Sequence, residues 1–338
     1  MNLLITGGGT GGHLAIARAL KEAALATGHE CLYVGSRSGQ DRSWFENDQE
    51  FHHRYFLETT GVVNKKGIGK IKAILGVMKA MLDVWKIIRS EKIDAVISVG
   101  GYSAAPASLV AMLLRIPFFI HEQNAVAGRL NTMLKPYSRA FFSSYDVDSP
   151  VQDYPVSRRF FEIARTRSEI HNVIFLGGSQ GARFINDLAL ELAPILHAKG
   201  IHVIHQCGES DYARVKKVYE DQDLDVELYG FTSDIPILLQ RSDLAIARAG
   251  ASSLWEFCAA GIPAFFVPYP YAAGDHQFYN AEYLRKKHLA WCERQSVSMS
   301  RSILGLLGEN IETKSRALQE LIAPDGAVKI IQYIEEHV

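Results

Sequence analysis

The chain has 338 residues, of which 48% are hydrophobic and 22% are charged, and its formal net charge at pH 7 is -1. This composition is typical of a soluble globular protein, and the length predicts two domains of roughly 150 residues each. The near-neutral charge excludes a general polyanion-binding protein, so we expect no nucleic-acid partner.

The predicted elements begin with a strand at residues 2–6, which runs into the glycine-rich sequence GGGTGGH at 7–13. A glycine-rich turn lets the backbone approach a ligand closely, and a helix that starts there directs free N–H groups and a positive dipole end at it. The run therefore predicts an anion-binding turn. His13 adds a ring that can act as an acid or a base near neutral pH, and a histidine that caps the helix is the alternative interpretation.

The glycines of this run also fit the dinucleotide-binding pattern G-x-G-x-x-G, which requires an acidic residue at the end of the second strand. The second predicted strand, residues 30–35, is followed by Ser36 and Arg37 instead. This difference disfavours an NAD-dependent dehydrogenase, while Arg37 leaves an NADP-binding reductase as an alternative.

Short apolar runs rich in Val, Ile and Phe alternate with helical patterns along the rest of the chain, which is typical of βαβ units with buried parallel sheets. We expect first-half strands at 2–6, 30–35, 94–100, 117–122 and 140–144. The pattern then restarts, with expected strands at 172–178, 202–208, 226–231, 244–250, 263–269 and 289–293. The fold class is therefore α/β, with two Rossmann-like halves.

An irregular segment with mixed charges and two prolines, residues 143–166, is the expected linker between the halves. We place one domain at 1–160 and the other at 161–338. The tail at 326–338 predicts a closing helix that can pack on either domain.

Small and polar residues follow the expected strands at five places, split between the two halves. They form the segments SVGGYSAAP, HEQNAVAG, LGGSQGARFIND, ARAGASSLWE and VPYPYAAGDHQFYNA. Ligands of open parallel sheets bind at the carboxyl ends of the strands, so this distribution favours two facing domains with a ligand between them.

Six motifs in these segments occur in the order found in a known family. They are TGGGTGGH at 6–13, GGYSAAP at 100–106, HEQNAVAG at 121–128, GGSQGAR at 177–183, RAGASSLWE at 248–256 and DHQFYNA at 275–281. The chain thus resembles the MurG family of bacterial peptidoglycan glycosyltransferases. The resemblance implies a GT-B fold, in which two Rossmann-like domains face each other across a cleft. It also implies an inverting transfer of N-acetylglucosamine from UDP-N-acetylglucosamine to undecaprenyl-pyrophosphoryl-MurNAc-pentapeptide (lipid I), giving lipid II, without a cofactor or a metal.

Most of the donor site implied by the resemblance lies in the second half. Glu256 is expected to accept hydrogen bonds from the ribose hydroxyls, because a carboxylate can serve both donors of a vicinal diol. The complete implied donor set comprises Thr10, Gly11, Gly12, Asn124, Ser179, Thr232, Ala251, Ser252, Ser253, Glu256, Gln277 and Asn280. Within this set Thr232 reads the uracil through its backbone, and the two amides of the last motif hold the sugar hydroxyls. Ser157 stands where the family has a linker arginine, and a phosphate role for the following Arg158 stays open.

The acceptor is expected at the strand ends of the first half, where Gly9 and Tyr102 bind it. His13 and Glu122 are the two candidates for the base that removes the proton from the muramyl 4-hydroxyl. We favour His13 as the base and Glu122 as the partner that orients and charges it, and the residues alone also allow the reverse assignment. His121 precedes Glu122 on the same strand, so its side chain points to the opposite face and is interpreted as structural.

Residues 64–92 carry eight basic and two acidic residues, a local charge of +6 in a nearly neutral chain. One helical stripe, expected to face the core, consists of Ile71, Ile74, Leu75, Met78, Leu82 and Trp85. A second apolar set, which widens the arc beyond that need, consists of Val77, Met81, Val84 and Ile88. A basic amphipathic helix favours an anionic membrane surface, and a buried helix with a solvated lysine face is the alternative.

The four cysteines are scattered without a C-x-x-C pair, which argues against a zinc site or a disulfide framework and fits a reducing cytoplasm. The N-terminus lacks a signal-peptide pattern, and no stretch reaches the roughly 18 apolar residues of a spanning helix. We therefore expect a cytoplasmic protein bound peripherally to the cytoplasmic face of the bacterial inner membrane. Its expected partners are UDP-N-acetylglucosamine, lipid I, the anionic membrane surface and cell-wall synthesis proteins, with roles in cell shape and division.

Two alternatives stand beside the reductase. One is a GT-B transferase with another acceptor, against which the HEQNAVAG motif and the basic amphipathic stretch argue. The other is a non-enzymatic sensor of sugar nucleotides, which would bind UDP without turnover.

Overall fold

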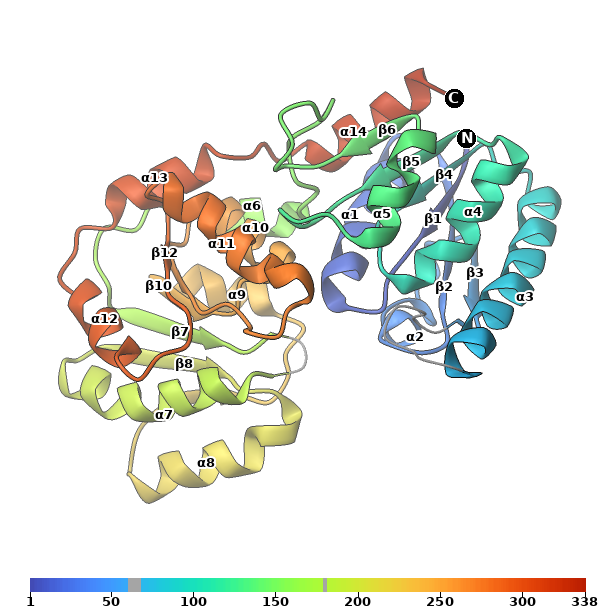
Figure 1. Cartoon of the computed structure of the whole chain (residues 1–338). Helices are drawn as coiled ribbons and strands as arrows, with labels where there is room; N and C mark the ends of the chain where they lie inside the picture. Colours follow the sequence, from blue (N-terminus) through green and yellow to red (C-terminus); the bar gives the residue numbers. More distant parts are fainter. Residues whose placement is uncertain (60–67, 179–180) are drawn as a thin grey trace. The chain divides into compact units, whose positions relative to one another are not determined.

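The computed structural model describes residues 1–59, 68–178 and 181–338. By its internal contacts the chain divides into two units, the first formed by residues 1–157 with 324–338 and the second by residues 158–323. Each unit contains one six-stranded parallel sheet flanked by helices (Figure 1). The predicted α/β class with two Rossmann-like halves is confirmed.

The sheet of the first unit has the strand order β3-β2-β1-β4-β5-β6. Its strands are β1 (Asn2–Thr6), β2 (Glu30–Ser36), β3 (His53–Leu57), β4 (Ala95–Ser98), β5 (Phe118–His121) and β6 (Ala140–Phe142). The sequence predicted all of them except β3, whose sequence HRYFL is neither alternating nor continuously apolar. β3 lies at the edge of the sheet and is only partly buried, so it does not need the apolar run that marks a central parallel strand.

Helices flank this sheet, and the C-terminal helix is one of them. The helices are α1 (Gly11–Ala26), α2 (Asp41–Phe45), α3 (Ile68–Ser90), α4 (Ala105–Leu114), α5 (Arg129–Leu134) and α14 (Gly326–Glu336). α14 packs on α1, and Lys329 of α14 forms an ion pair with Asp153 at 2.7 Å. The tail that follows the second unit in sequence is therefore part of the first.

α3 turns a different face toward the core from the one that we predicted. Its buried side chains are Ala73, Ala80, Val84, Ile87 and Ile88, and the last three pack in one apolar cluster with α4. The described side chains of the stripe expected to be buried are instead exposed by 40% to 64%: Ile74, Leu75, Met78, Leu82 and Trp85. The side chain of Ile71 lies outside the described residues. The prediction is wrong because it counted large apolar residues, whereas the buried face includes two alanines, whose small side chains let α3 approach the core closely.

The sheet of the second unit has the order β12-β11-β10-β7-β8-β9. Its strands are β7 (Asn172–Leu176), β8 (His202–Gln206), β9 (Glu227–Tyr229), β10 (Leu244–Ala247), β11 (Ala264–Phe266) and β12 (Trp291–Cys292), all at predicted positions. Its helices are α6 (Arg158–Glu162), α7 (Arg183–Ala198), α8 (Tyr212–Asp221), α9 (Ile235–Arg241), α10 (Ala251–Ala260), α11 (His276–Lys286), α12 (Met299–Leu306) and α13 (Glu312–Gln319).

A buried arginine joins two helix ends in the second unit. The guanidinium of Arg167, a residue only 1% exposed, donates to the carbonyl oxygens of Leu239, Ser242 and Ala260 at 2.6 to 2.9 Å. Burial lowers the pKa of Arg167 to about 9. Carbonyls in the last turn of a helix lack the usual N–H donor four residues on, so this one cation supplies donors to the ends of both α9 and α10.

The turns after β1 and β4 lie in direct contact. The Gly8 N–H donates to the Gly100 carbonyl at 3.1 Å, and Gly7, Gly100 and Gly101 have φ values of 120°, 89° and 83°. A Cβ atom on Gly101 would lie 2.1 Å from the Gly8 carbonyl oxygen, and one on Gly7 would lie 2.3 Å from that of Gly100. The packing of one turn against the other therefore requires glycine, whatever ligand binds there.

We expect Gly101→Ala to lower the free energy of unfolding of the first unit more than Gly28→Ala does. Gly28 has a similar φ of +80°, but a Cβ atom there would meet nothing within 4 Å, so Gly28→Ala measures backbone strain alone, about 1–2 kcal/mol. Gly101→Ala adds the clash with Gly8. Urea unfolding followed by circular dichroism compares the two variants, and equal losses would show that the two turns separate at no cost.

Candidate functional site

The neighbouring strands β1, β4 and β5 bring their following turns together at the carboxyl edge of the first sheet. Asp41, buried at the start of α2, holds the first of these turns. Its carboxylate accepts hydrogen bonds from the Gly9 N–H at 2.5 Å and the Ser36 N–H at 2.7 Å, while burial raises its pKa. The Tyr33 hydroxyl donates to the Gly7 carbonyl at 2.7 Å. The sequence analysis did not single out Asp41, because a buried carboxylate in a short helix has no sequence signature.

His13 lies in the first turn of α1 with both ring nitrogens engaged. Its Nδ1 is 2.9 Å from the Thr10 hydroxyl oxygen, and its Nε2 is 2.9 Å from Nε2 of Gln123. An amide nitrogen only donates, so with the amide in this orientation Nε2 of His13 is the acceptor and the proton of the neutral ring sits on Nδ1. The amide of Gln123 thus contacts the ring of His13 directly, a contact that the sequence analysis missed although Gln123 lies within a quoted motif.

The carboxylate of Glu122 is buried and organises the loop after β5. It accepts hydrogen bonds from the N–H groups of Asn124 and Gly128, each at 2.9 Å, and from the Asn131 amide at 2.8 Å. Four donors, including the more distant Asn124 amide at 3.4 Å, compensate for the burial of this charge. These contacts indicate that Glu122 orders the loop. Gln123, the next residue of the loop, forms the hydrogen bond to His13.

The other predicted residues of the first unit gather at the same edge. The ring of Tyr102 packs against Gly9, and its hydroxyl donates to the Ser38 carbonyl at 2.7 Å. Thr10 is the N-terminal cap residue of α1, whose first two residues are Gly11 and Gly12.

His121 is 1% exposed, and its ring packs edge-on against Tyr154 with the ring centroids 5.5 Å apart. Burial, with a smaller contribution from the charge of nearby His13, lowers the pKa of His121 to about 3. The ring is therefore neutral at physiological pH, in line with a structural role.

The second sheet presents its own carboxyl edge. α10 begins at Ala251 directly after the turn that follows β10, with Gly250 as its N-terminal cap residue. Ala251 and Ser252 are buried and Ser253 is half-buried. The free N–H groups of this first helical turn and the positive end of the helix dipole form an environment that favours an anion.

Glu256 lies farther along α10 and is partly exposed. In the part of the chain that the structure describes, no group donates a hydrogen bond to its carboxylate. Burial by the surrounding chain raises the pKa of Glu256 to about 7. A carboxyl group in this state gains from any ligand that brings two hydroxyl donors to it.

Two predicted amides lie on α11, beside the start of α10. Gln277 accepts a hydrogen bond from the Tyr269 N–H at 2.9 Å. Asn280 is fully buried, and its amide donates to the Ala249 carbonyl at 3.3 Å. α11 is thus tied to the turn that leads into α10.

Thr232 follows the edge strand β9, and its hydroxyl accepts a hydrogen bond from the Asp234 N–H at 3.0 Å. Ser179, predicted as a donor in the turn after β7, lies outside the described residues.

Two arginines near this edge differ sharply in environment. Arg248, which precedes α10 and was not among the predicted site residues, is half-buried and donates to the carbonyls of Val267 and Pro268 at 3.1 and 3.2 Å. Burial lowers its pKa to about 10. The side chain of Arg158 is 84% exposed and faces Glu162 at 3.6 Å. The guanidinium of Arg248 is thus held at the carbonyls that follow β11, whereas Arg158 has a solvent-exposed position in α6.

Two family models match the chain. The Glycosyltransferase family 28 N-terminal domain matches residues 3–143, and the Glycosyltransferase family 28 C-terminal domain matches residues 172–330. The chain belongs to glycosyltransferase family 28.

Relatives of this family 28 chain include two proteins named UDP-N-acetylglucosamine--N-acetylmuramyl-(pentapeptide) pyrophosphoryl-undecaprenol N-acetylglucosamine transferase. The protein from Wolinella succinogenes is 53% identical over 334 residues, 99% of each chain. The protein from Sulfurimonas denitrificans is 52% identical over 331 residues, 98% of this chain and 97% of its own. The crystal structure of Acinetobacter baumannii MurG is similar with a TM-score of 0.77 and 26% identity, covering 99% of both chains.

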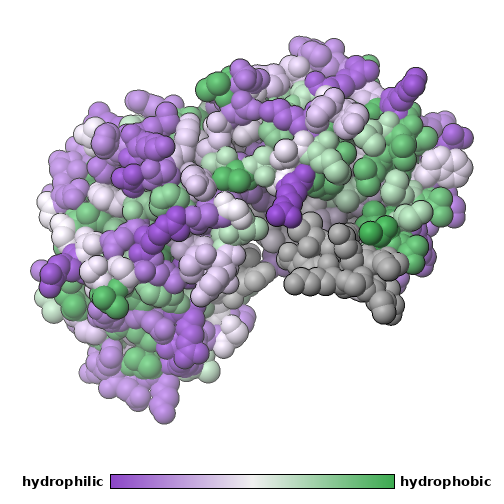
Figure 2. Space-filling view, viewed as in Figure 1, coloured by the Kyte–Doolittle hydropathy of each residue, from purple (hydrophilic) through white to green (hydrophobic). Residues whose placement is uncertain are grey.

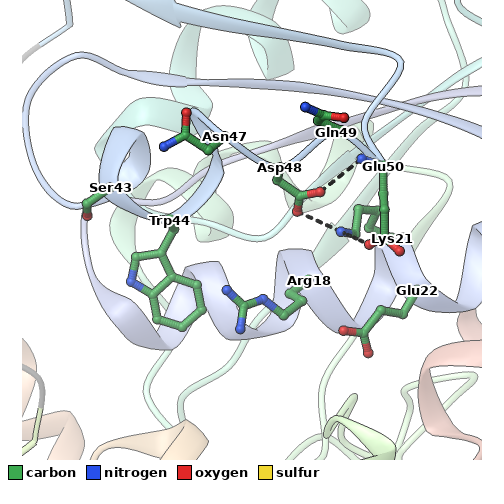
Figure 3. Close-up of a pocket in the computed structure, with 9 residues that line it drawn as sticks. All are labelled: Arg18, Lys21, Glu22, Ser43, Trp44, Asn47, Asp48, Gln49 and Glu50. Carbon is green, nitrogen blue, oxygen red and sulfur yellow. Dashed lines mark hydrogen bonds and ion pairs between the residues drawn. The ribbon is translucent and has the colours of Figure 1, made fainter. Parts of the chain in front are cut away.

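A hollow of about 520 Å³ on the first unit of this family 28 chain lies beside α1 and α2 (Figure 3). The Arg18 guanidinium stacks over the Trp44 ring at 4.6 Å, and Lys21 is neutralised by Asp48 and Glu50, each at 2.6 Å. None of the predicted site residues lines this hollow. Its buried cation, Lys21, is already paired with two carboxylates.

Proposed function

We propose that the chain transfers N-acetylglucosamine from UDP-N-acetylglucosamine to the 4-hydroxyl of MurNAc in lipid I, giving lipid II. The observation that carries the proposal is the full-length, 53% identity to the Wolinella succinogenes protein whose name states this transfer. The chemistry at the two carboxyl edges supports it, because a sugar transfer needs donors for an anionic leaving group and a base for the acceptor. Release of UDP with UDP-N-acetylglucosamine and a short-chain lipid I analogue tests the reaction, and NADPH binding measured beside it tests the reductase alternative.

The start of α10 is suited to the leaving group. UDP gains negative charge as its bond to the sugar breaks, and preorganised N–H donors and a helix dipole stabilise that charge more strongly than water does. The first residues of α10, from Ala251 to Ser253, supply these donors, and the serine hydroxyls add two more. Arg248, three residues before α10, adds a positive charge held by the Val267 and Pro268 carbonyls.

His13 is our proposed base. Its Nε2 carries a lone pair that the Gln123 amide occupies in the free protein. In the complex, the muramyl 4-hydroxyl takes the place of this amide and gives its proton to Nε2, while the Nδ1 proton stays directed at the Thr10 hydroxyl oxygen. Thr10 then stabilises the imidazolium as a hydrogen-bond acceptor.

Glu122 acts through the loop in this proposal. Its bonds to Asn124, Gly128 and Asn131 hold the loop that carries Gln123, and through Gln123 they hold the ring of His13. Removal of the carboxylate therefore disturbs catalysis without removing the base.

We expect His13→Ala to lower kcat by about 10² to 10⁴, the usual contribution of a general base, with little change in UDP affinity, because the implied ribose and uracil sites lie on the other unit. The acidic limb of the kcat–pH profile should disappear with the imidazole. Steady-state kinetics across pH and calorimetry with UDP make these measurements.

Glu122→Gln separates the two candidates for the base. In our proposal the Glu122→Gln substitution lowers the free energy of unfolding by about 1–3 kcal/mol, because the loop loses acceptors. The variant keeps the acidic limb of the kcat–pH profile. Near-full kcat in His13→Ala, together with loss of the acidic limb in Glu122→Gln, would make the carboxylate the base.

We expect the affinity for UDP-N-acetylglucosamine to rise with pH around the Glu256 pKa of about 7. The ionised carboxylate accepts hydrogen bonds from both ribose hydroxyls, whereas the protonated form has lost part of that capacity, so binding favours the ionised form. Below this pKa the affinity should fall by up to about tenfold per pH unit. Calorimetry between about pH 5.5 and 8.5 measures it.

Glu256→Gln is the matched control, because it keeps the shape and removes the ionisation. Its affinity should be lower at high pH by about ten- to a hundredfold and should not change with pH. Since the folded-state pKa of Glu256 is raised, its contribution to folding stability is present below the ordinary value of 4.5 and is lost as pH rises to about 7. An identical pH profile in the variant would remove Glu256 from the ribose site.

The exposed apolar stripe of α3 supports peripheral membrane binding. Ile74, Leu75, Met78, Leu82 and Trp85 are exposed together on this helix, and Figure 2 shows hydrophobic side chains gathered over α3 and α4. We call these five residues the α3 stripe. Lys79, Lys86 and Arg89 are exposed on the same helix, and the Arg89 guanidinium lies 4.8 Å from the Trp85 ring centroid. Apolar side chains flanked by cations match a bilayer surface with anionic headgroups.

Among the described residues, no helix is long and apolar enough to cross a membrane.

We propose that the α3 stripe inserts into the cytoplasmic face of the inner membrane, where lipid I is presented. This location makes the enzyme a supplier of peptidoglycan precursor for cell shape and division, alongside other proteins of cell-wall synthesis.

We expect Leu82→Ser to weaken binding to vesicles that contain phosphatidylglycerol by about tenfold or more, because a buried leucine is worth about 1.5–3 kcal/mol. Ile237→Ser, which removes an apolar side chain that is 51% exposed on α9 of the second unit, is the matched control and should bind normally. Vesicle cosedimentation at low and high salt measures both variants. Equal binding by Leu82→Ser and the unmodified chain would place the membrane contact elsewhere.

A further inference from the structure

A cluster of metal-ligating side chains lies at the opposite edge of the first sheet from His13. His52 and His53 stand at the amino end of β3, and Glu91 follows the last residue of α3. One ligand atom from each of the three lies within 4.8 Å of the others. Within residues 1–59, 68–178 and 181–338, this is the one group of three His, Cys, Asp or Glu side chains with such spacing.

The distances suit a small divalent ion. Nδ1 of His53 is 3.2 Å from Oε1 of Glu91, and the two imidazole rings lie with centroids 4.5 Å apart. Zinc binds imidazole nitrogen at about 2.0–2.1 Å and carboxylate oxygen at about 2.0–2.2 Å, so two tetrahedral ligands stand roughly 3.4 Å apart. His53 and Glu91 already have nearly this separation, and a small rotation brings the exposed His52 ring to the same ion.

The carboxylate is prepared for a cation. The Tyr55 hydroxyl donates to Oε1 of Glu91 at 2.5 Å, and Tyr55 together with the two histidines lowers the pKa of Glu91. A carboxylate oxygen has two lone pairs, so Oε1 can accept this hydrogen bond and still ligate a metal, and a hydrogen bond to a ligating carboxylate is a usual feature of metal sites. The cluster also lies at the C-terminal end of α3, where the helix dipole favours positive charge.

We propose that His52, His53 and Glu91 form a surface site for one Zn²⁺ ion, with water completing the coordination. The site joins the edge strand β3 to the end of α3, so the ion braces the helix that carries the α3 stripe. It lies at the amino edge of the sheet, whereas the residues proposed for sugar transfer lie at the carboxyl edge, and the ion takes no part in that reaction.

Calorimetry with zinc chloride on the full chain, pretreated with a chelator, tests the site. We expect one ion per chain, and we expect His52→Gln and His53→Gln each to weaken binding by at least about tenfold, since even the loss of a group that only orients a ligand costs about 10- to 100-fold. His171→Gln is the matched control. This exposed histidine also faces a glutamate, Glu169 at 3.0 Å, but belongs to no three-residue cluster, so the variant should bind zinc normally.

Two further readouts keep the test decisive. Zinc should raise the melting temperature of the unmodified chain and of His171→Gln but not of His53→Gln, with unchanged far-ultraviolet circular dichroism in all three. The Co²⁺ derivative should lack a thiolate charge-transfer band. Failure of the unmodified chain to bind zinc, equal binding by His53→Gln, or a thiolate band that assigns the ion to a cysteine would each overturn the proposal.

Discussion

The backbone contact between the turns after β1 and β4 is the constraint on which the first unit depends. Gly101 and Gly7 lie so close to the opposite turn that a single Cβ atom at either would overlap a carbonyl oxygen. This contact, together with the Asp41 carboxylate that holds the Gly9 N–H, fixes where α1 begins and therefore where His13 stands. The glycine-rich opening of the chain thus has a structural reason that precedes any role in ligand binding.

In the second unit, a different kind of contact positions the helix that begins at the carboxyl edge, α10. Its α10 is positioned from its C-terminal end, where Arg167 donates to carbonyls at the ends of α9 and α10. A Cβ atom on Gly250, the cap residue of α10, would meet nothing within 4 Å, in contrast to the crowded Gly101. Open space at a helix N-terminus suits an anionic ligand, which supports the proposed leaving-group site at α10.

The sequence predicted the strands that share a repeated apolar pattern. It missed structural features that depend on one particular packing contact. Eleven of the twelve strands in the described residues follow from buried apolar runs, whereas β3 was not predicted because an edge strand does not need such a run. The buried face of α3 was wrong because small residues such as Ala73 pack closely without contributing to a count of large apolar side chains. Motifs located the residues of the two edges, but the partners that orient them, such as Gln123, are set by packing between distant segments, which no motif records.

Glu122 and Glu256, one at each carboxyl edge, differ in the hydrogen bonds that their carboxylates accept. Both belong to quoted motifs, so the sequence treats them alike. Glu122 is buried among four hydrogen-bond donors of its own loop, and its charge is compensated within the protein. Glu256 receives no hydrogen bond from the described residues, and burial raises its pKa. A buried carboxylate that accepts several hydrogen bonds stabilises the fold, whereas one that lacks them gains stability when a ligand supplies donors, and this difference supports the proposed role of Glu256 in binding the ribose.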